Sequence, residues 1–178
     1  FQFAALKQDR ETIQTLLDYT IKRHHPEIGE SQNKPLSLLE AVIEKQAELI
    51  THWMRVGFIH GVMNTDNMAL SGETIDYGPC AFMDTYDPAT VFSSIDHGGR
   101  YAYANQPAIA QWNLARLAET LLPLLDDDPN KAKDLAVEAI HSFGAVYKEK
   151  SLSMLRAKVG LLDVQPEDEK LITDLLDW

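Results

Sequence analysis

The chain has 178 residues, enough to bury the core of one domain. Its formal net charge of −11, without any run of basic residues, argues against a nucleic-acid partner. No apolar stretch approaches the roughly 20 residues of a membrane span, and the single cysteine, Cys80, excludes an internal disulfide. We therefore expect a soluble protein of a reducing compartment, cytoplasmic or, in a eukaryote, mitochondrial.

Most of the chain has the apolar period of amphipathic helices. Pro107, Pro129 and Pro166 stand where three of these helices begin, a position that tolerates proline. Gly57 and Gly160 follow the last apolar residues of two others, as glycine does at helix C-termini. In chain order, the expected helices lie at about 13–21, 35–57, 105–121, 128–143, 152–159 and 166–176.

The helical period disappears between Gly57 and Ala104, a stretch that holds six of the nine glycines. Short β segments are expected at 68–70 and 74–77, with a turn between them. A long irregular segment inside a helical domain usually carries function. We therefore place the catalytic and metal-binding loops at 57–104, within one mainly α domain spanning 1–178 that has one or two short β-hairpins.

Two motifs in this segment have the spacing of protein-kinase motifs. His60 and Asn67 are separated like the ends of H-R-D-x-x-x-x-N, and Asp76-Tyr77-Gly78 follows like D-F-G. Asn67 and Asp76 offer the oxygen ligands that Mg²⁺ prefers. Tyr77 is expected to pack inward, as the Phe of D-F-G does.

The loop departs from the kinase pattern at its base. Val62 occupies the position of the kinase Asp, and valine can neither accept a proton nor bind a metal. The carboxylate nearest to the metal-ligand position is Asp66. We interpret His60 as a structural residue that holds the loop, and Cys80 as a small buried residue rather than a nucleophile.

Taken together, these motifs closely resemble the selenoprotein O family. The resemblance is strong over residues 57–125 and weaker in the flanking helices. It is carried by HGVMNTDNM at 60–68, IDYGPCAFMD at 75–84, YDP at 86–88, SSID at 93–96, GRYAYANQP at 99–107 and WNLARLAE at 112–119.

The resemblance implies a protein-kinase-like fold that transfers AMP from ATP to Ser, Thr or Tyr hydroxyls of protein substrates. On the matching positions, Asp66 is the proton acceptor, and Asn67 and Asp76 are ligands of Mg²⁺ or Mn²⁺. Asp76 is also expected to contact the nucleotide.

The resemblance also bears on which part of that fold the chain contains. No glycine-rich phosphate loop is found, and the chain begins at Phe1 without Met and ends at Trp178. We therefore expect a C-terminal-lobe fragment that lacks half of the ATP site and is inactive on its own.

Two other functions are compatible with the same residues. One is phosphoryl transfer, because the loop chemistry is shared and only the placement of the nucleotide decides which phosphate is attacked. The other is a non-catalytic pseudokinase scaffold that binds partners through its helices. The mass added to an acceptor protein distinguishes AMP transfer, phosphate transfer and no reaction.

Overall fold

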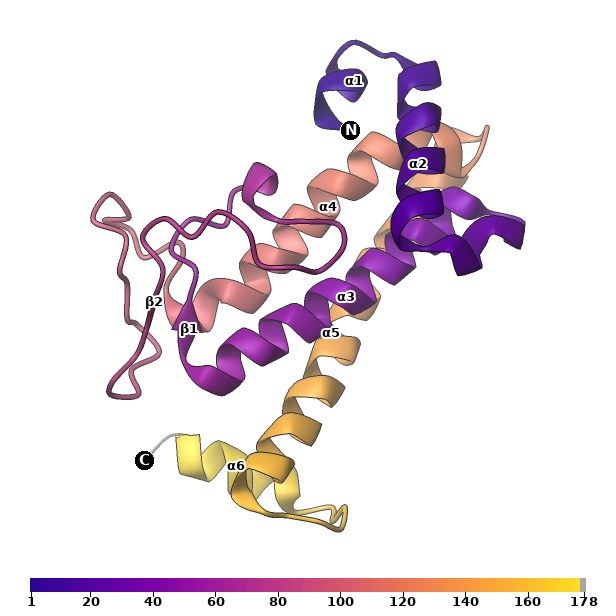
Figure 1. The fold of residues 1–178 in the computed structure, drawn as a ribbon. Helices are drawn as coiled ribbons and strands as arrows, with labels where there is room; N and C mark the ends of the chain where they lie inside the picture. The colour runs from indigo at the N-terminus through magenta and orange to yellow at the C-terminus, as the bar shows by residue number, and fades with distance from the viewer. Residues whose placement is uncertain (177–178) are drawn as a thin grey trace.

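The computed structural model describes residues 1–176, so Trp178, which we interpret as a core or interface anchor, lies outside the described residues. The structure is mainly helical, with one small antiparallel sheet, in agreement with the predicted class (Figure 1). Its elements are α1 (Gln2–Leu6), α2 (Arg10–His24), η1 (Pro26–Glu30), α3 (Lys34–Val56), β1 (Phe58–Ile59), η2 (Thr65–Asn67), β2 (Ala81–Phe82), η3 (Tyr103–Asn105), α4 (Gln106–Leu125), α5 (Pro129–Val159) and α6 (Asp168–Leu176).

Three long helices, α3, α4 and α5, form the centre of the protein, and each packs against the other two (Figure 1). Their apolar residues recur three and four positions apart and so share one face of each helix. Three of the four buried residues of α5 are alanines. The loops of 57–105 lie on one side of α3 and α4, which give them a rigid support. The buried residues of the three helices include Leu39, Val42, Ile43, Ile50, Ala110, Leu114, Leu121, Ala132, Ala136 and Phe143.

Helix α3 leads directly into these loops, so the position of its end matters. Its first turn is capped by Asn33, whose side-chain oxygen accepts a hydrogen bond from the backbone N of Leu36 at 3.2 Å. It ends at Gly57, whose left-handed backbone (φ 69°) disfavours any residue with a Cβ. The chain therefore leaves the helix one residue before strand β1.

One continuous helix, α5, replaces the two helices predicted at 128–143 and 152–159. The segment between them has no proline, and its single glycine, Gly144, costs only about 1 kcal/mol in a helix interior. The predicted ends are correct: Asp128 caps the first turn by accepting from the backbone N of Asn130 at 2.9 Å, and Gly160 ends the helix with φ 79°.

Helix α6 begins at Asp168, two residues after the predicted start at Pro166. The Asp168 carboxylate is buried and accepts hydrogen bonds from Arg156 Nε at 2.7 Å and from the backbone N of Gln165 at 3.0 Å. This ion pair fastens α6 to the end of α5.

The sheet does not use the predicted β segments at 68–70 and 74–77, which meet only through an isolated bridge between Met68 and Thr74. Strands β1 and β2 pair antiparallel instead, with Phe58 opposite Phe82 and Ile59 opposite Ala81. Strands of two residues are too short to show the alternation from which strands are predicted.

Within residues 1–176, none of the helices combines the length and the apolar composition that crossing a bilayer requires.

Candidate active-site loop

Gln106, the first residue of α4, holds the chain where it leaves strand β1. Its side chain is completely buried. Gln106 Oε1 accepts from the backbone N of His60 at 3.0 Å, and Gln106 Nε2 donates to the backbone O of Phe58 at 2.9 Å. The backbone O of Phe58 and the backbone N of His60 point to the same side of the chain, because residues two positions apart in an extended strand do so. The side-chain amide thus fixes the start of the loop to the beginning of α4.

Two further buried amides fix the middle and the end of the loop. Asn113 of α4 donates from Nδ2 to the backbone O of Met63 at 3.0 Å. Gln46 of α3 donates from Nε2 to the backbone O of Ala69 at 2.7 Å. Both helices therefore hold the segment that contains the predicted catalytic residues.

Two tyrosines before α4 add further contacts, one to the loop and one to α3. Tyr101 donates from its hydroxyl to Asn64 Oδ1 at 2.7 Å, and Tyr103 donates to the backbone O of Met54 at 2.6 Å. Burial raises the pKa of Tyr103 to about 12. The Tyr103 hydroxyl therefore remains a hydrogen-bond donor at physiological pH.

His60 connects this loop to the segment that contains Asp76. The ring is completely buried, and its Nε2 lies 2.8 Å from the backbone O of Ile75. A carbonyl can only accept, so Nε2 carries the proton and Nδ1 faces the backbone N of Val62 at 3.4 Å. The next residue after Ile75 is Asp76, which His60 thereby keeps beside the loop.

Gly61 allows the two segments to approach closely. A Cβ at this position would lie 2.9 Å from Pro79 Cγ, and the backbone φ is +86°. Any other residue would therefore push the Asp76 segment away from the loop or strain the backbone.

The structure places Asp66 and Asn67 in one turn, η2. Asp66 is exposed, whereas Asn67 is half-buried and donates from Nδ2 to the backbone O of Val62 at 3.0 Å. This bond uses the amide nitrogen and leaves Asn67 Oδ1 available for another ligand. Within residues 1–176, no three His, Cys, Asp or Glu side chains lie close enough to hold a metal ion together.

Asp76 is exposed and has a positive φ of 54°. A left-handed backbone costs an L-residue about 1–2 kcal/mol, although Asp and Asn tolerate it better than most. The conformation is held by its surroundings, since the backbone N of Gly78 donates to the backbone O of Asp76 at 2.8 Å. Strain of this kind often accompanies a functional position.

The predicted position of Tyr77 is wrong. Its side chain is 65% exposed, and its ring meets Phe58 only edge-on, with centroids 6.5 Å apart. Phe58 itself fills the space beneath it by packing against Trp53 and Phe82. Cys80 is partly buried and packs against the core.

Sequence reasoning missed the three amides that hold the loop, Gln46, Gln106 and Asn113. A signal for two of them exists, because Gln46 and Asn113 interrupt the apolar faces of α3 and α4. A polar residue at a core-facing position must find a partner when buried, and here the partner is a loop carbonyl.

A protein-family model described as protein adenylyltransferase SelO matches residues 1–178. The chain belongs to this family. The similarity therefore extends over the helices that flank the loops as well as over the loops themselves.

Curated proteins that are similar to the chain have related names. Proteins named protein nucleotidyltransferase YdiU from Nitrosococcus oceani, Alcanivorax borkumensis and Pelagibacter ubique are 60%, 56% and 57% identical to the chain over all 178 residues. The chain covers 36%, 37% and 37% of their lengths, respectively. It thus spans little more than a third of these relatives.

The hydrogen bonds of His60 give a first testable prediction for this SelO-family protein. His60→Phe keeps the ring packed against Trp53 but removes the donor to Ile75, so we expect the unfolding free energy to fall by about 1–3 kcal/mol. If Asp76 has the metal and nucleotide roles expected from the sequence, affinity of the complete protein for Mg²⁺-ATP should fall with it, because Asp76 loses its support. Urea unfolding and calorimetry measure the two effects. The matched control is His52→Phe on the exposed side of α3, which should change stability by less than about 0.5 kcal/mol; equal effects would contradict the role of His60.

Proposed function

We propose that the complete protein transfers AMP from ATP to Ser, Thr or Tyr hydroxyls of other proteins, and that this chain is the C-terminal lobe of its kinase-like fold. Membership of the SelO family supports nucleotidyl transfer. One observation carries the assignment of the site: the turn with Asp66 and Asn67 is joined through His60 to the strained segment at Asp76.

Asp66 is suited to receive a proton from an acceptor hydroxyl. It is exposed, it lies on a loop held by both flanking helices, and no ion pair within residues 1–176 occupies its carboxylate. The hydroxyl oxygen would attack the α-phosphorus of ATP and form the new P–O bond. The bond from the α-phosphorus to the bridging oxygen would break, pyrophosphate would leave with that electron pair, and Asp66 would hold the hydroxyl proton.

Asn67 and Asp76 have the donor atoms that suit a hard divalent cation. The amide nitrogen of Asn67 is already used, so its free oxygen and the Asp76 carboxylate offer two oxygen ligands, and phosphate oxygens can supply others. Mg²⁺ or Mn²⁺ bound there would offset the charge of the phosphates. The left-handed backbone of Asp76 fixes where its side chain leaves the chain, which would favour one placement of the carboxylate.

The deciding experiment uses the complete protein, because the chain spans little more than a third of its relatives. An acceptor protein is incubated with the enzyme, ATP and Mg²⁺, and its intact mass is measured. Addition of AMP is the expected result. Addition of phosphate would instead indicate a kinase-type phosphotransferase, and an unchanged acceptor would indicate a non-catalytic scaffold.

Val62 gives a second prediction, because it occupies the position of the kinase base. Its side chain is half-buried, so Val62→Asp would place a carboxylate where desolvation disfavours its charge. We expect a loss of about 1–3 kcal/mol of stability and no transfer of the γ-phosphate. Thermal melting and product mass test both points, with the exposed Val137→Asp on α5 as control. A stable variant that transfers γ-phosphate would contradict the assignment of Asp66.

A further inference from the structure

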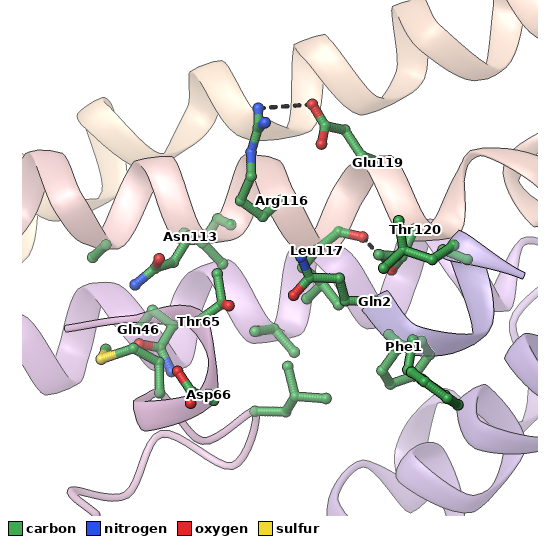
Figure 2. A pocket seen from close by; sticks show the side chains of 18 residues that line it. Phe1, Gln2, Gln46, Thr65, Asp66, Asn113, Arg116, Leu117, Glu119 and Thr120 are labelled. Carbon is green, nitrogen blue, oxygen red and sulfur yellow. Dashed lines mark hydrogen bonds and ion pairs between the residues drawn. The ribbon is translucent and has the colours of Figure 1, made fainter. Parts of the chain in front are cut away.

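A hollow of about 630 Å³ lies beside the candidate loop, between α1, α3 and α4. Figure 2 shows Thr65 and Asp66 at one end of it and Phe1 toward the other. The candidate base therefore forms part of the wall. Most of the remaining wall is apolar and includes Val42, Met68, Leu70, Leu114 and Leu117.

Two of the three charges in this wall neutralise each other. Only three of its side chains are charged, and two of them, Arg116 and Glu119, form an ion pair at 2.7 Å between Nη2 and Oε1. Figure 2 shows this pair directed away from Asp66. Asp66 is thus the single charged wall residue that has no ion-pair partner within residues 1–176.

Two buried amide oxygens add to the polar character of the end near Asp66. Gln46 Oε1 and Asn113 Oδ1 have no hydrogen-bond partner among the described residues, and both side chains belong to the wall. Their amide nitrogens are held by loop carbonyls, so the oxygens cannot be exchanged for donors by turning the amides. Buried acceptors of this kind are normally satisfied by a donor, but both oxygens are covered by other atoms, so they are not open to a chain that enters the hollow.

We infer that this hollow receives a large apolar side chain, such as Leu, Met or Phe, from the acceptor protein, within a few residues of the modified hydroxyl. The inference rests on the proposed function and specifies its substrate. A hydroxyl that reaches Asp66 brings its neighbours with it, and an extended chain advances about 3.3–3.6 Å per residue. A neighbour within a few residues of the hydroxyl can therefore reach the hollow.

The lining decides which neighbour is favoured. Burial of a large apolar side chain against apolar walls is favourable, whereas a buried charge would lose its hydration. A flanking lysine could form an ion pair only with Asp66, and that pair would occupy the carboxylate that the acceptor hydroxyl needs. A flanking carboxylate would also be repelled by Asp66. The size of the hollow lies within the range of small-ligand sites, so it can enclose such a side chain.

The test uses the complete protein with ATP, Mg²⁺ and peptides that contain a single Thr. Leu, Ala, Lys or Glu is placed in turn at each of the three positions on either side of the Thr. At one position or more, Leu should give a kcat/KM about 10- to 100-fold above that of Ala, with Lys and Glu no better than Ala. Similar values for all four residues at every position would overturn the inference.

A substitution in the wall should reverse the preference. Leu117→Glu places a carboxylate in the hollow, so a peptide with Lys at the preferred position should become a better substrate than the Leu peptide. The matched control is Leu124→Glu, which is equally half-buried on α4 but lies outside the hollow and should keep the preference for Leu. A Leu preference that survives Leu117→Glu would count against the inference.

A crosslinking measurement does not depend on how these variants fold. A peptide with benzoylphenylalanine at the preferred position is irradiated with the wild-type complete protein, and the joined residues are identified by mass spectrometry. Crosslinks within 66–70 or 110–120 support the inference. Crosslinks that lie only elsewhere overturn it. That second result is expected if another part of the complete protein fills the hollow. AMP transfer without any flank preference refutes only this inference, whereas absence of AMP transfer to any acceptor refutes the proposed function as well.

Discussion

Asp66→Asn in the complete protein is expected to lower the kcat for AMP transfer by about 10²- to 10⁴-fold, the usual contribution of a general base. The amide has the same shape as the carboxylate but cannot take the proton of the acceptor hydroxyl. Affinity for Mg²⁺-ATP should remain nearly unchanged, because the base acts on the acceptor rather than on the nucleotide.

Asp76→Asn is expected to weaken nucleotide binding, which Asp66→Asn should leave unchanged. Asparagine tolerates the left-handed backbone at this position as well as aspartate does, so the fold should be unaffected. The loss of negative charge should weaken metal-dependent nucleotide binding by at least about 10- to 100-fold, a loss seen even when an outer partner of a metal site is removed. AMP transfer should be lost with the binding.

Calorimetry with ATP in the presence and absence of Mg²⁺, together with single-turnover kinetics, measures both variants. Each is isosteric with the wild type, so a comparison of their melting curves controls for misfolding. If both variants lose nucleotide binding equally, Asp66 belongs to the metal site rather than to the acceptor. If neither loses activity, the loop is not the active site.

The second large effect is expected from Gln106→Leu. Leucine fills a similar volume but leaves the backbone N of His60 and the backbone O of Phe58 buried without partners. Each unpaired group costs about 1–3 kcal/mol, so the unfolding free energy should fall by about 2–6 kcal/mol. The damage should be local as well, because the loop that begins at His60 loses its attachment to α4.

Urea unfolding gives the size of this effect, and hydrogen exchange gives its location. The amide of His60 should exchange faster in the variant, whereas amides in the middle of α5 should keep their protection relative to global unfolding. Gln111→Leu is the control on the same helix. The Gln111 side chain donates to the backbone O of Ile140 at 3.1 Å, and the loss of this bond should cost about 1 kcal/mol. Unchanged exchange at His60 would contradict the role given to Gln106.

The sequence was informative wherever structure depends on neighbours along the chain. The starts of α4 and α5 follow from the prolines at their first turns, and the ends of α3 and α5 follow from Gly57 and Gly160. The location of the irregular segment, between residues 57 and 104, is visible as a loss of helical period. The SelO family assignment likewise rests on motifs that are contiguous in sequence.

The features that the sequence did not predict depend on contacts between residues that are far apart in the chain. The pairing of Phe58 with Phe82 requires the loop between them to fold back, and strands of two residues carry no recognisable pattern. The analogy with D-F-G predicts an inward Tyr77, but Phe58 already occupies the interior there. The hollow next to Asp66 combines residues of α1, α3 and α4 with the loop, and nothing in their spacing reveals that they meet.

The side-chain amide of Gln106 also affects how other polypeptide chains can bind to this protein. A strand with a free edge can recruit a further strand from another molecule, which is a common route to aggregation. Within residues 1–176, both sides of β1 are used, because β2 pairs with one side and Gln106 bonds the backbone O of Phe58 and the backbone N of His60 on the other. A peptide that approaches the loop is therefore not expected to bind by strand addition at β1.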